Sequence, residues 1–580
     1  MTKQVITLAL ASSALLLVGS SCSQKLRPMT ADQVKATPQP LELVGGKVPV
    51  AVHLTFPAKW FPKNAVLTVE PILRYQGGEK WGTGISFQGE KVYGNDRIVY
   101  YANGSNNTVN FVLPYVPAMA KSELYLSFKG KQGSKTVKLP ELKVADGVIS
   151  TEALATLDGV SPVIAPDGFQ RIVKEAYDAN IMFQIQQANV RSSELNKDEV
   201  QEWKYTVQNA KETPNQRVSV EVQAYASPDG GKELNEKLSA NREKNTTAKL
   251  KSEFKQQKMA DVAIDAHYTA QDWEGFKQLV EKSDFQDKDL VLRVLSMYPD
   301  PEQREREIRN ISAVFSKLAD EVLPKLRRSR LIANVQIIGK SDEEIQQMLE
   351  KYPSALTVEE LLYSATLTDN VQQKENIYKI VMQKYPKDYR AYNNVGALCL
   401  QRGDYEAARI WLDRALQRKD NPESKVSLGL LALKDGDLTK ATNLIAEGSA
   451  LPGAGDVLGY LYLRQGEYAK AATAYGDIAT NNAAVAQILA RNYSKAIQAL
   501  EGVKNPTAIT DYLRAVVAAR MGDSRLALSS LQKAIQKNPS LSTQLDYDLE
   551  FAGLRGLKDF QSLIGAHTDS PGFKLKHTPD

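Results

Sequence analysis

Three kinds of hydrophobic pattern follow one another along the chain. In residues 36–150, apolar and polar positions alternate over short runs, which is the period of two of β-strands. Residues 168–340 mix such alternation with apolar spacings of three and four, which predicts strands and helices together. Residues 341–565 are helical in pattern throughout, and the pattern repeats. The fold class predicted is therefore multidomain: an N-terminal β-sandwich, a central α+β domain and a C-terminal all-α solenoid. The remaining segments are a signal peptide (1–21), linkers (22–35 and 151–167) and a tail (566–580).

The N-terminal domain reads as short strands separated by turns. Glycine- and asparagine-rich runs mark the turns, as expected for hairpins. The expected strands are Val48–Phe56, Ala65–Leu73, Asp96–Tyr101, Thr108–Leu113 and Leu124–Phe128. Regular short strands of this kind favour an immunoglobulin-like sandwich. His53 lies alone in a strand, where a structural role is favoured over that of a ligand.

The stretch 218–242 combines a strand, a turn and a helix. Val218 to Ala224 alternates with a period of two, and the sequence Ser-Pro-Asp-Gly-Gly at 227–231 predicts a turn. A helix then follows, and its N-terminus leaves backbone N–H groups free to hold an anion. Arg242 lies about two turns along this helix, and its planar guanidinium suits a carboxylate.

This stretch resembles the core motif of the OmpA-like, peptidoglycan-associating domain. The residues that carry the resemblance, with no gap in their spacing, are Gly230, Asn235, Leu238, Ser239 and Arg242. In that family an Asp and the Arg hold the diaminopimelate of the peptidoglycan stem peptide. Here Ser227 occupies the position of the Asp, while Asp229 stands two residues further on. The resemblance implies a peptidoglycan site of Ser227, Asp229, Gly230, Asn235 and Arg242. The alternative is an OmpA-like scaffold that no longer binds peptidoglycan.

The sequence also contains segments that match the other strands and helices expected of this domain. The expected strands are 181–185, 262–268 and 330–338, and the first helix spans 197–210. A helical insertion at about 272–305 is either a docking surface or, as we favour, an elaboration of the packing. Asp265 and His267 share one face of a strand, but two residues without a third make neither a metal site nor a catalytic triad.

The C-terminal region repeats a skeleton of small and aromatic residues. One unit contains Gly396, Gly403 and Ala408, and the same skeleton returns around Gly429 and around Gly459. The skeleton resembles tetratricopeptide repeats, whose period is about 34 residues and whose helical hairpins stack into a solenoid with a concave groove. The resemblance implies protein partners that bind as extended peptides or helices. Cys399 falls at a helix-packing position, which favours a buried apolar role over a nucleophile.

The N-terminus has the pattern of a bacterial lipoprotein signal. Lys3 precedes an apolar run from Val5 to Val18, and small residues lead to Cys22. The resemblance implies acylation of Cys22 and anchoring in the outer membrane without a spanning helix. Acidic residues that mark surface export in some anaerobes are missing after Cys22, which favours the periplasmic face. An ordinary secretory signal with cleavage nearby is the alternative.

Composition excludes several function classes. The chain has 73 basic and 68 acidic residues and a net charge of +5, with no basic stripe for nucleic acid. Its four histidines are scattered, and it has no nucleophile elbow, phosphate loop or metal-ligand cluster. We therefore expect no enzyme activity, no catalytic residue, no cofactor and no metal.

Two functions remain. The first is an outer-membrane lipoprotein scaffold that is tethered to peptidoglycan and recruits outer-membrane or periplasmic proteins through its repeats, for example in assembly of an envelope, secretion or pilus machine. The second is a pure protein–protein adaptor, which the Ser at 227 favours.

Overall fold

The computed structural model describes residues 25–228, 231–284, 287–310 and 312–565. These residues form two compact units, of which one contains the segments up to 166 and from 371 onward, and the other contains 167–370. Cys22 lies outside the described residues. Among those described, no helix combines the length and the apolar character needed to cross a membrane.

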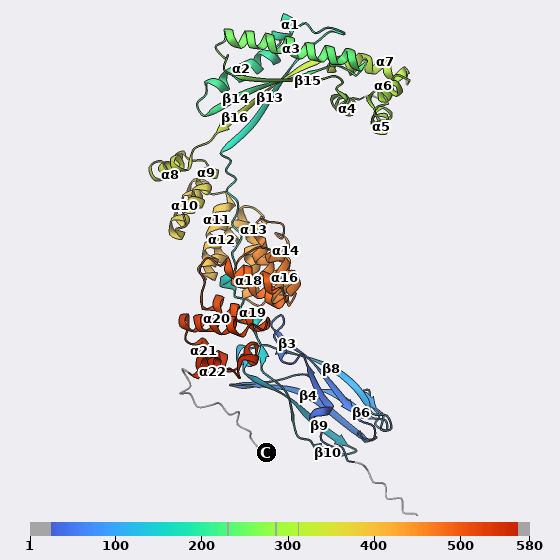
Figure 1. Cartoon of the computed structure of the whole chain (residues 1–580), viewed down its shortest axis with the longest axis vertical. Coiled ribbons are helices and arrows are strands. Elements are labelled where there is room, and N and C mark those ends of the chain that lie inside the picture. The colour runs from blue at the N-terminus through green and yellow to red at the C-terminus, as the bar shows by residue number, and fades with distance from the viewer. Residues whose placement is uncertain (1–24, 229–230, 285–286, 311, 566–580) are drawn as a thin grey trace, which may run out of the picture. The chain divides into compact units, whose positions relative to one another are not determined.

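The N-terminal part of the first unit is rich in β-sheet (Figure 1). A three-stranded antiparallel sheet runs in the order β1 (Val34–Thr37), β3 (Lys47–Phe56), β8 (Ser105–Pro114). A larger sheet runs in the order β10 (Lys135–Lys138), β9 (Ser122–Gln132), β4 (Ala65–Tyr75), β6 (Ile85–Gly89), β7 (Arg97–Val99), with β11 (Leu142–Asp146) on β9 and β5 (Gly78–Trp81) on β4. A short parallel pair joins β2 (Leu41–Glu42) to β12 (Val148–Ile149). The sequence predicted strands at β3, β4, β7, β8 and β9, but not at β1, β2, β5, β6, β10, β11 and β12.

Both large sheets contribute to one apolar core. Along β3, Val48, Val50 and Val52 are buried, and the residues between them are more exposed, which is the predicted alternation. Phe56 packs edge-on against Phe61 and Phe87, which brings the two sheets together.

The C-terminal part of this unit is an array of helical hairpins. The hairpins are α11 (Tyr389–Gln401) with α12 (Tyr405–Arg418), α13 (Pro422–Lys434) with α14 (Leu438–Ala446), α15 (Ala454–Gln465) with α16 (Tyr468–Tyr475), α17 (Asn481–Leu489) with α18 (Tyr493–Glu501), and α19 (Ala508–Arg520) with α20 (Ser524–Lys537). Helix α10 (Val371–Lys384) precedes them, and α21 (Leu541–Leu545) and α22 (Lys558–Gly565) follow. The first helices of neighbouring hairpins contact one another. We call the face that these first helices form the inner face.

Glycines explain why the same skeleton recurs. A side chain at Gly396 would meet Leu412 at 2.8 Å, and one at Gly429 would meet Ile445 at 2.5 Å. Each glycine thus lets the first helix of a hairpin approach the second closely. Cys399 is buried in the same packing and is 1% exposed. The predicted apolar role fits this burial, which also raises the pKa of the thiol.

The second unit is built on a four-stranded sheet in the order β13 (Ile172–Met182), β16 (Arg328–Ile338), β14 (Gln216–Tyr225), β15 (Ala263–Thr269). Only β14 and β15 are parallel. Helices α2 (Asp198–Glu212) and α3 (Lys232–Gln256) pack on one face, where Trp203 and Phe254 join Val220 and Val222 in a core (Figure 1). Strand β13 begins earlier than the expected 181–185 and ends at Met182.

Short helices extend the chain between β15 and β16. These are α4 (Trp273–Lys282), α5 (Lys288–Met297), α6 (Pro301–Asn310) and α7 (Ser312–Glu321). They bury an apolar cluster of their own that includes Phe276, Val291 and Leu326. The insertion therefore continues beyond the expected limit near 305. Helix α1 (Ser192–Leu195) lies between β13 and α2, and helices α8 (Asp342–Lys351) and α9 (Val358–Ser364) follow β16.

Candidate functional site on the inner face of the repeats

Buried polar side chains mark the inner face of the array. Asn393, Asn394, Asp456 and Asn482 lie on first helices, and each is 3% exposed or less. Burying a polar group costs free energy unless it is hydrogen-bonded, so their partners identify what this face binds. The partners here are main-chain groups of a distant stretch of the same chain.

That stretch is residues 151–166, which we call the resident segment. It was expected as a linker or a first helix, and it is instead mostly extended with two short 3-10 turns. In Figure 1 it is the cyan thread that runs through the helical array. Val160, Val163 and Ala165 are buried in it, at 7%, 3% and 1% exposed. Pro162 is buried as well, whereas Ile164, between Val163 and Ala165, is 43% exposed and faces solvent.

The strongest grip is on the C-terminal end of the resident segment. Asn394 on α11 accepts from the N–H of Ala165 at 2.8 Å and donates to its C=O at 3.3 Å. Asn393 donates to the C=O of Val163 at 3.2 Å and to Asn394 Oδ1 at 3.0 Å. Ser424 on α13 in turn donates to Asn393 Oδ1 at 3.1 Å. This chain of buried hydrogen bonds fixes the orientation of both amides.

A second amide grips the other end in the same way. Asn482 on α17 accepts from the N–H of Thr156 at 3.0 Å and donates to its C=O at 2.8 Å. Tyr405 donates to Asp158 at 2.7 Å, which is a contact to a side chain of the segment. A carboxamide that pairs with both groups of one residue recognises a main chain and not a side chain.

Asp456 on α15 holds the middle of the segment. Its Oδ2 accepts from the N–H of Ser161 at 2.8 Å. Burial raises the pKa of this carboxyl, because its charged form is poorly solvated inside the interface.

Glu152 anchors the start of the resident segment to the β-sheet part and to the helical array of the same unit. Its carboxylate accepts from the N–H groups of Gly45 and Gly46, at 2.6 and 3.0 Å, in the turn before β3. It also accepts from the hydroxyl of Tyr468 on α16 at 2.7 Å. Burial and the nearby Glu152 charge raise the pKa of Tyr468, which keeps this hydroxyl a donor. One buried carboxylate thus joins the sheets, the segment and the array.

The predicted peptidoglycan residues lie in the other unit, at the turn between β14 and α3. Asp229 and Gly230 are outside the described residues. Ser227 is 5% exposed, and its C=O accepts from the side-chain amide of Asn235 at 2.9 Å. The structure therefore brings Ser227 and Asn235 together, with the amide bracing the turn.

Arg242 lies close to this turn but is directed at the main chain. It is 1% exposed and donates to the C=O of Tyr225 at 2.8 Å and to that of Gln187 at 2.9 Å. A longer contact of 3.5 Å reaches Gln184 O, and the guanidinium lies 5.0 Å from the Phe183 ring centre. It thereby ties the chain after β13 to the end of β14. Its role toward peptidoglycan stays a prediction.

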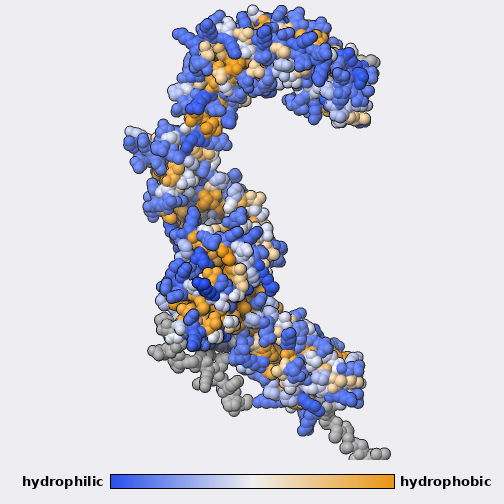
Figure 2. All heavy atoms as spheres, viewed as in Figure 1, coloured by the Kyte–Doolittle hydropathy of each residue, from blue (hydrophilic) through white to orange (hydrophobic). Residues whose placement is uncertain are grey.

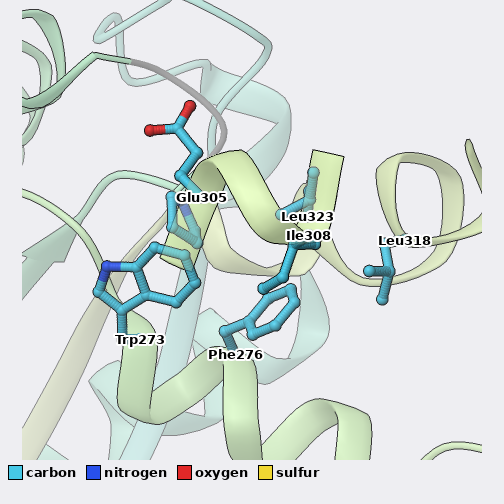
Figure 3. A pocket seen from close by; sticks show the side chains of 7 residues that line it. Trp273, Phe276, Glu305, Ile308, Leu318 and Leu323 are labelled. Atoms are coloured by element: carbon cyan, nitrogen blue, oxygen red, sulfur yellow. The ribbon is translucent and has the colours of Figure 1, made fainter. Parts of the chain in front are cut away.

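A cavity adjoins the same turn (Figure 3). Its volume is about 10 Å³, about the space of one water molecule, and it is lined by Pro228, Trp273, Phe276, Glu305, Ile308, Leu318 and Leu323. Ligand pockets usually hold about 300 to 1,000 Å³, so this space is a gap at the edge of the insertion's core. Among the described residues, no group of His, Cys, Asp and Glu is placed to hold a metal ion.

Sequence reasoning did not single out Asn394, Asp456 or Asn482. Their signal was present as polar amides and a carboxylate within otherwise apolar first helices, such as the run from Ala391 to Leu400. A polar residue inside a repeat helix is interpreted as a surface residue as long as the segment that covers it is unknown. For Asn394 the covering residue, Ala165, lies 229 positions away in the sequence.

Comparison with known sequences agrees with the repeat pattern. Residues 375–424 match the sequence profile of the tetratricopeptide repeat, so the C-terminal region contains repeats of this kind. A comparison with curated proteins finds no match.

Solved structures with likeness to the chain include several repeat proteins. A tetratricopeptide repeat protein from Parabacteroides merdae has 16% identity and a TM-score of 0.25, with 39% of this chain and 90% of that chain covered. PilF of Pseudomonas aeruginosa has 15% identity and a TM-score of 0.27, with 38% and 100% covered. Yeast Tom70 has 12% identity and a TM-score of 0.24, with 59% and 78% covered.

Proposed function

We propose that the chain is a non-enzymatic protein–protein adaptor whose repeat array binds extended peptide segments. The observation that carries the proposal is the pair of buried amides, Asn394 and Asn482, each bonded to both main-chain groups of one residue. Such contacts make no demand on the side chain of the bound residue, so they suit segments of varied sequence.

The proposed location is the outer membrane, with Cys22 as the acylated residue and the protein facing the periplasm. The support is the sequence pattern around Cys22. Fractionation of cells that express the chain or its Cys22→Ser variant tests the anchor. The variant is expected in the soluble envelope fraction, and a variant that stays in the membrane fraction would refute acylation at Cys22.

Of the two functions, the adaptor without peptidoglycan binding is favoured by the surroundings of Arg242. The guanidinium is 1% exposed and is bonded to main-chain oxygens on two sides, so it offers a ligand in solution almost no accessible surface. Co-sedimentation of residues 23–580 with purified peptidoglycan decides between the two. We expect no sedimentation above background. Sedimentation that Arg242→Ala abolishes, while Arg217→Ala (an exposed arginine in the same unit) does not, would restore the tether.

Crosslinking in intact cells, read out by mass spectrometry, tests the adaptor itself. We expect crosslinks from the chain to one or a few envelope proteins. Crosslinks confined to the chain itself, in cells grown under conditions where the protein is produced, would contradict the proposal.

A further inference from the structure

We infer that the resident segment is a built-in ligand that closes the inner face of the repeats to partner segments. This inference rests on the proposed function, because it concerns the same surface. Amides on α11 and α17 and a carboxylate on α15 are all engaged by residues 156–165. A partner segment that used these groups would have to displace the chain's own.

The contacts define the kind of segment that fits. The array takes up the N–H groups of Thr156, Ser161 and Ala165, none of which is proline. Pro162 and Pro166 each follow one of these residues, at positions where the array accepts no hydrogen bond from the main chain. Proline also favours the extended backbone that the inner face binds. Small apolar side chains occupy the buried positions, at Val160, Val163 and Ala165. The ligand class is thus an extended, proline-containing segment with small apolar residues at intervals.

The covalent connection makes the closure strong. The resident segment follows β12 directly, and Glu152 fixes its start between the Gly45–Gly46 turn and Tyr468. A segment held this way acts at an effective concentration on the order of millimolar. A free peptide with the same contacts and a Kd of roughly 10 μM would bind the closed face about 100-fold more weakly than the open one.

The test opens the face by changing the segment and leaving the array untouched. In full-length soluble chain, residues 23–580, the double substitution Val160→Asp/Val163→Asp places carboxylates at two buried positions and is expected to expel the segment. Ile164→Asp, at the exposed position between Val163 and Ala165, is the matched control. Hydrogen exchange of residues 151–166 reports whether the segment has left.

The probe is a fluorescein-labelled synthetic peptide with the wild-type sequence of residues 150–167, followed by anisotropy. We expect the double variant to bind it about 100-fold or more tightly than the wild type and the Ile164→Asp chain. Adding Asn394→Ala to the double variant should remove the binding. If the double variant does not fold, replacement of residues 155–165 by an equally long Gly/Ser sequence serves the same purpose.

Two results would overturn the inference, and they differ in what else they refute. Equal affinity of the wild type and the opened chain would show that the segment does not close the face, while the face would remain a peptide site. No binding by an opened chain whose segment exchanges freely would refute both the closure and the proposed function of the inner face.

Discussion

Removal of the Asn394 side chain should release the C-terminal end of the resident segment. Asn394→Ala deletes three buried hydrogen bonds, two to Ala165 of 2.8 and 3.3 Å and one from Asn393 of 3.0 Å. It leaves the N–H and C=O of Ala165 without these partners in a site where Ala165 is 1% exposed. Each lost bond contributes about 0.5 to 1.5 kcal/mol, and stranded buried groups add to this, so we expect a loss of roughly 3 kcal/mol. Since 1.4 kcal/mol is a factor of about ten, opening of the segment should become roughly 100-fold more frequent.

Peptide-level hydrogen exchange with mass spectrometry measures this change directly. In the regime where closing is faster than exchange, the rate for peptides that cover residues 160–166 should rise by roughly 100-fold, whereas core strands such as β4 should keep their rates. Asn443→Ala is the matched control, because this asparagine is exposed on α14 of the same array. A rise of less than about threefold in Asn394→Ala would refute the reasoning, since it would mean that these hydrogen bonds do not hold the segment.

Three other predictions concern Asp456, Arg242 and Gly45. Burial raises the pKa of Asp456 above the ordinary Asp value of 3.8, so the stability that this carboxyl contributes is full below pH 3.8 and is lost as the pH rises through the raised pKa. Asp456→Asn should therefore flatten the fall in the Tm of the array above pH 3.8, and an unchanged pH profile would contradict this. Arg242→Ala removes charged donors from buried carbonyls and should destabilise its unit by roughly 3 kcal/mol or more in urea unfolding, against less than about 0.5 kcal/mol for Arg217→Ala. Gly45 and Gly133 both have a positive φ, of +58° and +56°, but a side chain at Gly45 would meet the backbone of Gln465 at 3.1 Å, whereas one at Gly133 would enter open space. Gly45→Ala should therefore lower the Tm more than Gly133→Ala. Equal losses would show that the close contact with Gln465 does not affect stability.

The local patterns were sufficient for the elements but not for what covers them. Alternation along 48–56 and the spacing of Gly396 and Gly429 are local signals, and the strand and the hairpins formed there follow from them. The first strand of the second unit, β13, was predicted at 181–185 but begins at Ile172. The sequence did not show this start, because the residues from Ile172 to Tyr177 are exposed and carry no apolar alternation. Short strands such as β5, whose four residues are all exposed, have no hydrophobic pattern at all.

The inner face was missed for a different physical reason. Residues 151–166 contain two 3-10 turns, two prolines next to apolar residues and no period, so they read as a linker. Their structure is imposed by side chains more than 200 residues away, and hydrogen bonds to a main chain leave no complementary signature in the bound sequence. Arg242 is the reverse case, because the sequence did suggest a role for it. The resemblance implied that it binds a ligand, whereas in the structure its guanidinium donates to main-chain oxygens of this chain.

Much of the outer surface is polar, and apolar residues gather over the helical array on the face seen in Figure 2. Exposed apolar side chains on second helices of the hairpins include Ile410 at 54% and Leu526 at 46%. Such single exposed residues are ordinary for a soluble surface. The recognition that we assign to the chain therefore rests on the inner face.

Residue-resolved hydrogen exchange of the unmodified soluble chain tests that assignment most directly. The amides of Thr156, Ser161 and Ala165 are bonded to the array, while the amide of Ile164 has no bond to the array side chains that hold the segment. We predict that the three bonded amides are strongly protected and that Ile164, next to the protected Ala165, exchanges much faster. Uniformly fast exchange from 151 to 166 would show that the segment does not occupy the inner face, and would contradict the account.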